Sequence, residues 1–129
     1  RAPAHRTHAD SAGEANLGRM RLLVPISNTQ VEPAIYSALP KEVTLHVALL
    51  HLAQIATDSI ASMVDDIEAR SRDLATADVD VIVLGAAAPS LLKGLGYDRE
   101  IAKKIEAASG KRATTTSTAL VEALKHLGV

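Results

Sequence analysis

The chain has 129 residues, of which 47% are hydrophobic and 22% charged, so we expect one folded domain with a single buried core. Fourteen basic and fifteen acidic residues give a net charge of -1, which disfavours nucleic-acid binding, and no apolar run approaches the ~20 residues of a membrane-spanning helix. The sequence has no cysteine, which excludes a disulfide framework, a thiolate metal site and a cysteine nucleophile within it.

Residues 1–19 are rich in Ala, Gly, His and charge and show no periodicity, so we predict a disordered tail before a domain over 20–129. Met20 directly precedes the first strand-like run, which favours a domain that starts there. His5 and His8 have a spacing that can bind a metal, but no third ligand is fixed nearby, so we predict no metal site. The tail lacks the apolar stretch of a secretion signal, and we expect a cytoplasmic protein.

Strand-like and helix-like segments then alternate. Apolar runs predict strands at 21–26, 43–50 and 79–84, and the short segment at 112–115 is predicted as a fourth strand. Apolar residues spaced three, four and seven apart predict helices, over 31–39, from Asp58 or Ser59 to Leu74, from Asp98 to a terminating Gly110, and from Thr116 or Ser117 to Gly128. In the last helix we expect four residues to face the core: Leu120, Val121, Leu124 and Leu127.

This alternation predicts an α/β fold, flavodoxin-like or Rossmann-like, with a four-stranded parallel sheet and helices on both faces. The sequence stops where a fifth strand would begin, which leaves one sheet edge open for pairing. We therefore expect either a partner chain over that edge, such as a second copy in a homo-oligomer, or a sequence that is the first half of a longer protein. The half-protein interpretation is favoured.

In an open parallel sheet, ligands bind beyond the carboxyl ends of the strands. Three loops of small or polar residues fall at such ends, at 27–29, 85–90 and 114–118, and we expect them to line one pocket. Each loop precedes a helix, whose N-terminal N–H groups suit a carboxylate or phosphate. The expected ligand is a small anion, bound without a cofactor.

Each of these residue types also has a purely structural explanation. Asn28 and the TTTST run can simply cap helices, and the triple alanine can pack a helix tightly against the sheet. His46 and His51 are possible acid–base groups, but core histidines are the more frequent outcome. His126 is expected at the surface.

Other α/β functions fit the same loops poorly. The sequence after the first strand, VPISNT, has neither a P-loop nor a dinucleotide-binding glycine pattern. Gly94 and Gly96 lack the strand–turn–helix context of a nucleotide loop. A phosphoacceptor receiver would need acids at the carboxyl ends, whereas Asp78 and Asp80 precede the third strand.

Three motifs, LLVPISNTQVEP, VDVIVLGAAAPSLLKGLGYDRE and ATTTSTALVEALKHLGV, occur in the order found in the aspartate/glutamate racemase superfamily. From Met20 to Val129 the chain resembles the N-terminal half of its maleate cis-trans isomerase and arylmalonate decarboxylase branch. The resemblance implies two similar α/β halves related by a pseudo-two-fold axis, with the substrate between them.

The resemblance also implies roles for individual residues. Asn28 stands where the isomerases bind a substrate carboxylate, with Ser27 and Thr29 beside it. Ala86 stands at the position of the first catalytic cysteine, so no catalytic residue is assigned here. Ala87 and Ala88 replace hydroxyl residues of the decarboxylases and offer only backbone N–H groups.

The first hypothesis is therefore the N-terminal domain of a maleate-isomerase-like or racemase-like enzyme that acts on a small carboxylate. Its carboxylate site comprises Ser27, Asn28, Thr29, Ala86, Ala87, Ala88, Thr115, Thr116 and Ser117. Losing a covalent nucleophile costs on the order of 10⁶ in rate, so this chain alone is expected to be inactive. The alternatives are a one-cysteine decarboxylase, a non-catalytic carboxylate-binding or assembly module, and a protein in which residue 86 was altered from cysteine.

Overall fold

The computed structural model describes residues 18–51, 57–88 and 93–129, without the side chains of 57–61. The elements in chain order are β1 (Gly18–Pro25), α2 (Val31–Ala38), β2 (Val43–Leu50), α3 (Thr57–Asp73), the short 3-10 helix η1 (Leu74–Thr76), β3 (Val81–Leu84), α5 (Tyr97–Ser109), β4 (Arg112–Thr115) and α6 (Thr116–His126). The predictions made for residues 1–17 and for Pro89 and Ser90 lie outside this description. The prediction that Asp58 or Ser59 precedes and caps the long helix is wrong, because α3 begins at Thr57 and includes both residues.

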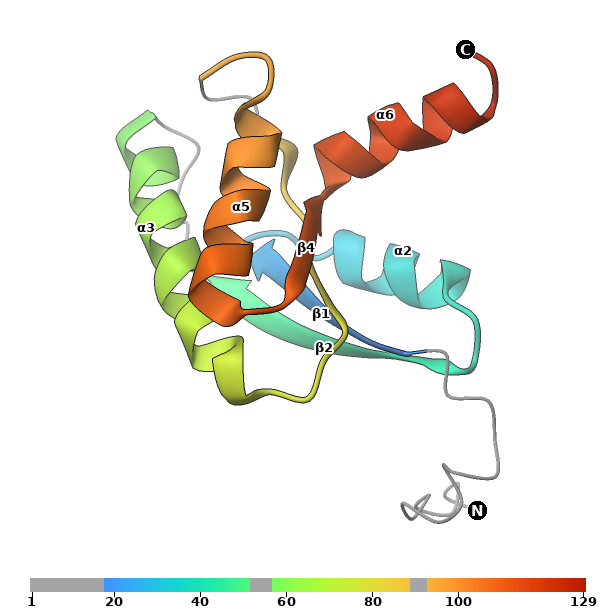
Figure 1. Cartoon of the computed structure of the whole chain (residues 1–129), viewed down its shortest axis with the longest axis horizontal. Coiled ribbons are helices and arrows are strands. Elements are labelled where there is room, and N and C mark those ends of the chain that lie inside the picture. Colours follow the sequence, from blue (N-terminus) through green and yellow to red (C-terminus); the bar gives the residue numbers. More distant parts are fainter. Residues whose placement is uncertain (1–17, 52–56, 89–92) are drawn as a thin grey trace.

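The four strands form one parallel sheet in the order β2-β1-β3-β4 (Figure 1). This is the flavodoxin-like order, in which the strand order reverses between β1 and β3. Leu84 of β3 lies level with Leu23 of β1 on one side and with Thr115 of β4 on the other. The predicted α/β class is therefore confirmed.

Helices cover both faces of the sheet, as predicted (Figure 1). On one face, α3 and α5 pack on a cluster that includes Leu23, Ile82 and Leu84, all fully buried. On the other face, Val31 and Ile35 of α2 pack against a smaller cluster around Leu22 and Val24. Alternation along β1 therefore sends successive leucines into two separate halves of the core.

Two strands start at residues other than those predicted, and β1 ends at Pro25 rather than Ile26. β1 begins at Gly18, so Gly18 and Arg19 belong to the sheet rather than to the tail. Arg19 is held there because its N–H donates to the Asp80 carboxylate at 2.7 Å and its carbonyl accepts from the N–H of Asp80 at 2.9 Å. β3 begins at Val81 instead of Val79, because the N–H of Val79 closes a tight turn on the carbonyl of Ala77.

Two helix caps also differ. The residue before α5 is Gly96, and Asp98 lies in the first turn of that helix instead of capping it. The cap of α6 is Thr115, one residue earlier than predicted, because its Oγ1 accepts from the N–H of Thr118 at 3.1 Å. Gly110 ends α5 as predicted, with a φ of 70° that favours glycine.

The apolar side chains of α6 were expected to face the core, and this expectation is wrong. Leu120 is 61% exposed and Leu127 73% exposed, and no residue of the helix is buried. Figure 1 shows α6 projecting away from the sheet beyond the end of β4. The periodicity correctly predicted an amphipathic helix, but no described layer of this chain lies against its apolar stripe.

Across the part of the chain that the structure describes, no helix is both long enough and apolar enough to cross a membrane.

Candidate functional site

The loops that follow β1, β3 and β4 leave the sheet at the same edge. Parallel pairing places all carboxyl ends together, and Leu23, Leu84 and Thr115 lie side by side in three neighbouring strands. The turns at 26–30, 85–88 and 116–118 therefore start next to one another, in the spatial order β1, β3, β4. We call this edge the carboxyl rim.

Asn28 connects the first turn to the start of α2. Its side-chain oxygen accepts hydrogen bonds from the N–H groups of Gln30 at 3.0 Å and Val31 at 3.1 Å, so it caps the helix. No described residue accepts from its Nδ2 group, which leaves two donors for a ligand. An open hollow of about 290 Å³ lies over this turn and is lined by Ser27, Asn28, Thr29 and Gln30.

Gly85 and the alanines after it form the second turn. Gly85 is buried, and its N–H donates to the carbonyl of Leu23 at 2.7 Å, which continues the contact between β3 and β1. Ala86 is half-buried and packs on the core cluster beneath α3 and α5, which agrees with the packing explanation for that residue. Ala87 and Ala88 are exposed in the first turn of a helix, where N–H groups carry partial positive charge.

Thr115 and Thr118 stabilise the third turn. The fully buried Thr115 hydroxyl accepts from the N–H of Thr118 and donates to the Thr118 hydroxyl, both at 3.1 Å. Thr116 and Ser117 lie between these two residues and are half-buried. The capping explanation therefore accounts for Thr115, while Thr116 and Ser117 remain possible ligand contacts.

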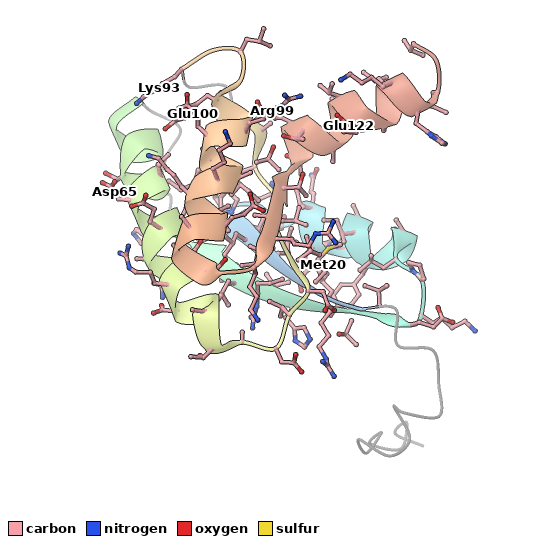
Figure 2. All side chains as sticks on the ribbon, viewed as in Figure 1. Met20, Asp65, Lys93, Arg99, Glu100 and Glu122 are labelled. Atoms are coloured by element: carbon pink, nitrogen blue, oxygen red, sulfur yellow. The ribbon has the colours of Figure 1, made fainter. Side chains whose placement is uncertain are left out.

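Sequence reasoning missed the link from this turn to α5. The Thr118 hydroxyl donates a hydrogen bond to Oδ2 of Asp98. Beside it lies a hollow of about 280 Å³, lined by Leu95, Gly96, Asp98, Arg99, Thr118, Val121 and Glu122. Figure 2 shows Arg99 at the start of α5 and Glu122 on α6, on the two sides of this hollow. No local pattern pairs residues twenty positions apart, so only the tertiary structure reveals the contact.

The described side chains thus form two hollows on the carboxyl rim, one at the β1 turn and one between α5 and α6. Neither is lined by residues of all three loops, so the single pocket expected from the sequence stays a prediction.

The histidines and acids set aside in the sequence lie away from the rim or at the surface. His46 and His51 are exposed, so the core interpretation of these two residues is wrong. His46 contacts the Thr44 hydroxyl at 3.3 Å, and His126 is exposed at the end of α6 as expected. Asp78 pairs with Arg19 at 2.6 Å at the amino-terminal edge of the sheet, the wrong end for a phosphoacceptor.

A four-stranded parallel sheet in the flavodoxin-like order, with helix-starting turns gathered at its carboxyl rim, defines a doubly wound α/β domain. A family model described as arylmalonate decarboxylase matches residues 20–129, and the chain belongs to that family.

The particular relatives include two enzymes from Pseudomonas putida. A maleate isomerase of this organism is 30% identical over 120 residues, which cover 84% of this chain and 48% of the relative. The solved maleate isomerase Iso is 24% identical with a TM-score of 0.73, over 85% of this chain and 49% of that chain. At that identity the likeness shows the fold alone.

A third relative is the maleate cis-trans isomerase of Nocardia farcinica, solved as a Cys-to-Ser variant with a covalently bound succinylcysteine intermediate. It is 25% identical with a TM-score of 0.75, over 85% of this chain and 49% of that chain. The chain therefore spans about half the length of the relatives it matches.

Proposed function

We propose that this domain supplies the N-terminal, carboxylate-binding half of a maleate-isomerase-like enzyme that works without a cofactor. The observation that carries the proposal is that the turns holding Asn28, Ala87 and Thr116 start side by side at the carboxyl rim of a chain whose relative is a maleate isomerase. The substrate class is a small carboxylate or dicarboxylate.

The chemistry of the rim fits an anion of this kind. Asn28 keeps its Nδ2 donors, and backbone N–H groups that carry partial positive charge lie in the first helical turns near Ala87 and Thr116. These groups are donors in fixed backbone positions, so they bind a carboxylate with little loss of conformational freedom. The remaining proposed contacts are Ser27, Thr29, Ala86, Ala88, Thr115 and Ser117.

Turnover requires more than this chain supplies. The sequence contains no cysteine, and the resemblance places Ala86 where the isomerases have a catalytic thiol. A thiolate that adds to an alkene carbon cannot be replaced by a methyl group. The chain by itself should therefore bind a dicarboxylate without isomerising it.

A second α/β unit is the proposed partner. The exposed stripe on α6 consists of Leu120, Val121, Leu124 and Leu127, and it continues to Val129, which is 86% exposed. The relatives are about twice as long as the segment matched here, so a further segment of similar size accompanies the corresponding domain in them. We propose that such a unit, supplied by the same polypeptide or by another chain, covers this stripe. A homodimer of this chain is the other arrangement to test.

An arylmalonate-decarboxylase-like lyase is the second candidate function. It is favoured by the matching family model and by the small side chain of Ala86, which leaves room for a bulky substituent near the rim. A non-catalytic carboxylate-binding module is the third. Both share the binding step with the isomerase. The decarboxylase differs from it in the preferred ligand, and the module differs from it in having no turnover.

Isothermal titration with maleate, phenylmalonate and the neutral diamide of maleate tests the proposal. We expect binding of the dianions and none of the diamide, with maleate preferred if the isomerase assignment is correct and phenylmalonate preferred if the decarboxylase is. Absence of dianion binding to the folded chain would overturn all three candidates.

The Asn28→Asp variant gives the sharper control. Aspartate retains the oxygen that caps α2 but replaces the Nδ2 donors with a negative charge, so the fold stays and the anion is repelled. We expect at least a tenfold rise in the Kd for maleate, on the order expected from losing one hydrogen bond to a charged group. Unchanged affinity would remove Asn28 from the site.

A further inference from the structure

The hydroxyl groups of Thr115 and Thr118 and the carboxylate of Asp98 form a directional hydrogen-bond chain. Thr115 Oγ1 donates to Thr118 Oγ1 at 3.1 Å, and Thr118 Oγ1 donates in turn to Asp98 Oδ2. The same Thr115 oxygen accepts from the Thr118 N–H. Each hydroxyl has one proton to donate. The Thr115 proton is donated to Thr118 and the Thr118 proton to Asp98, so the series of hydrogen bonds ends on the carboxylate.

These hydrogen bonds hold both ends of the third rim turn, which contains Thr116 and Ser117. Thr115 is fully buried at the end of β4, and Thr118 is held to the start of α5 through Asp98. Thr116 and Ser117 lie between these two residues in the first turn of α6. Because both neighbours are held by hydrogen bonds, the orientation of the Thr116 and Ser117 N–H groups is restricted. A hydrogen bond to an ionised acceptor is roughly twice as strong as a neutral one, which makes the Asp98 end the firmer anchor.

The rest of the contact between α6 and the domain is small. No side chain of α6 is buried, and the helix meets the domain mainly at β4 and α5. The Asp98–Thr118 bond lies at the wall of the hollow between α5 and α6. Among the described residues, the start of α6 is therefore held by the Asp98–Thr118 bond and by the strand before it.

We propose that Asp98 is a positioning residue for the ligand site: it fixes the Thr116 and Ser117 amides at the carboxyl rim by accepting from Thr118. The inference rests on the proposed function, because it assigns Asp98 to the same carboxylate site. Asp98 does not touch the ligand and acts only through the third turn.

A simpler role for Asp98 is to stabilise α5 as an acidic residue near the helix N-terminus. Glu100 is the matched control, because it lies in the same first turn, is exposed, and has no bond to Thr118. Glu100→Ala removes a comparable charge from α5 and leaves the third turn intact. Asp98→Asn removes the charge at the other position but retains an oxygen that can accept from Thr118.

The test is the Kd for maleate measured by calorimetry on the full chain, at a temperature where circular dichroism shows each variant folded. We expect Asp98→Ala to raise the Kd on the order of tenfold, as misplaced binding groups do. Asp98→Asn should restore most of the affinity, and Glu100→Ala should leave it unchanged. Thr118→Val should weaken binding like Asp98→Ala, and the double variant should be no weaker than either single one, because both remove the same bond.

A second experiment measures the backbone of the third rim turn directly. In ¹⁵N–¹H spectra, the amide resonances of Thr116 and Ser117 should shift in Asp98→Ala and stay close to wild type in Asp98→Asn and Glu100→Ala. Wild-type affinity in Asp98→Ala, or equal weakening in Glu100→Ala, would overturn the positioning role while leaving the proposed function intact. Failure of the wild-type chain to bind maleate would instead overturn the proposed function, and with it Asp98 as a residue of that site.

Discussion

The N–H of Gly85 donates a hydrogen bond to the carbonyl oxygen of Leu23 at 2.7 Å, so the first residue after β3 stays in contact with β1. A Cβ atom on Gly85 would lie 2.9 Å from Leu22 Cδ1, 3.2 Å from Val31 Cγ1 and 3.3 Å from the Leu23 carbonyl oxygen. Residue 85 can approach β1 and α2 this closely because it has no side chain.

We therefore expect Gly85→Ala to lower the free energy of unfolding by about 1–3 kcal/mol, as overpacking of a filled core does. Urea denaturation followed by circular dichroism measures the change. The control is the double variant Leu22→Ala/Gly85→Ala. Because Leu22→Ala removes the atom closest to the new Cβ, Gly85→Ala should lower the free energy of unfolding less in the Leu22→Ala background than in the wild type. Unaltered stability in Gly85→Ala would show that the turn has room that the structure does not show.

Asn28 has a structural role that can be measured separately from binding. Asn28→Ala removes the oxygen that accepts from the Gln30 and Val31 N–H groups, and we expect it to destabilise the domain by about 1 kcal/mol. Asn28→Asp keeps that oxygen, and its unfolding midpoint should match that of the wild type. A midpoint for Asn28→Asp as low as that of Asn28→Ala would mean that the Nδ2 group contributes to the fold.

The apolar stripe of α6 should matter for association more than for folding. Leu120 and Leu124 are 61% and 40% exposed, so replacing both with Gln should change the free energy of unfolding by no more than about 0.5–1 kcal/mol. Self-association in sedimentation experiments and binding of an apolar dye should both decrease. Ile105→Ala on α5 is the contrasting variant, since a fully buried isoleucine should cost about 2–5 kcal/mol. A large loss of stability in the α6 variant would show that the stripe packs within this chain.

Ala86 can be probed by chemistry that the natural sequence does not have. Because the chain contains no cysteine, Ala86→Cys introduces a unique thiol. We expect maleate to slow its alkylation by iodoacetamide, since a ligand held by the rim turns would lie over residue 86. Ala119→Cys, on the exposed side of α6, should be alkylated at the same rate with and without maleate. Equal rates for Ala86→Cys in the two conditions would place the ligand elsewhere.

Patterns within a few residues predicted most of the fold. The spacing of apolar residues located the first three strands and the helices, the fourth strand was placed by the alternation of elements, and 43–50 and 112–115 coincide with β2 and β4. These patterns succeed because burial on a sheet or helix repeats with the period of that element. The boundaries that moved, at Gly18, Val81 and Thr115, all depend on partners elsewhere in the chain or on a single turn bond.

Part of the candidate site could likewise be predicted from the sequence, and part could not. Strand order and the rule for parallel sheets were enough to predict that Asn28, Ala86 and Thr116 start from one edge, and the register of β1, β3 and β4 agrees. The contact between Asp98 and Thr118 could not be predicted, because twenty residues and a strand separate them. The solvent exposure of Leu120 and Leu127 could not be predicted either, because the spacing of apolar residues identifies an amphipathic helix but not the elements that pack against it.

By itself, then, the sequence determined the α/β class, the family resemblance and the segments that we propose for a carboxylate site, because each of these depends on local pattern and residue type. Only the tertiary structure decided which hydroxyls are already engaged in caps, which acid accepts from Thr118, and which apolar stripe is exposed. Those outcomes depend on distances between residues far apart in the chain, and such distances exist only after the strands have paired.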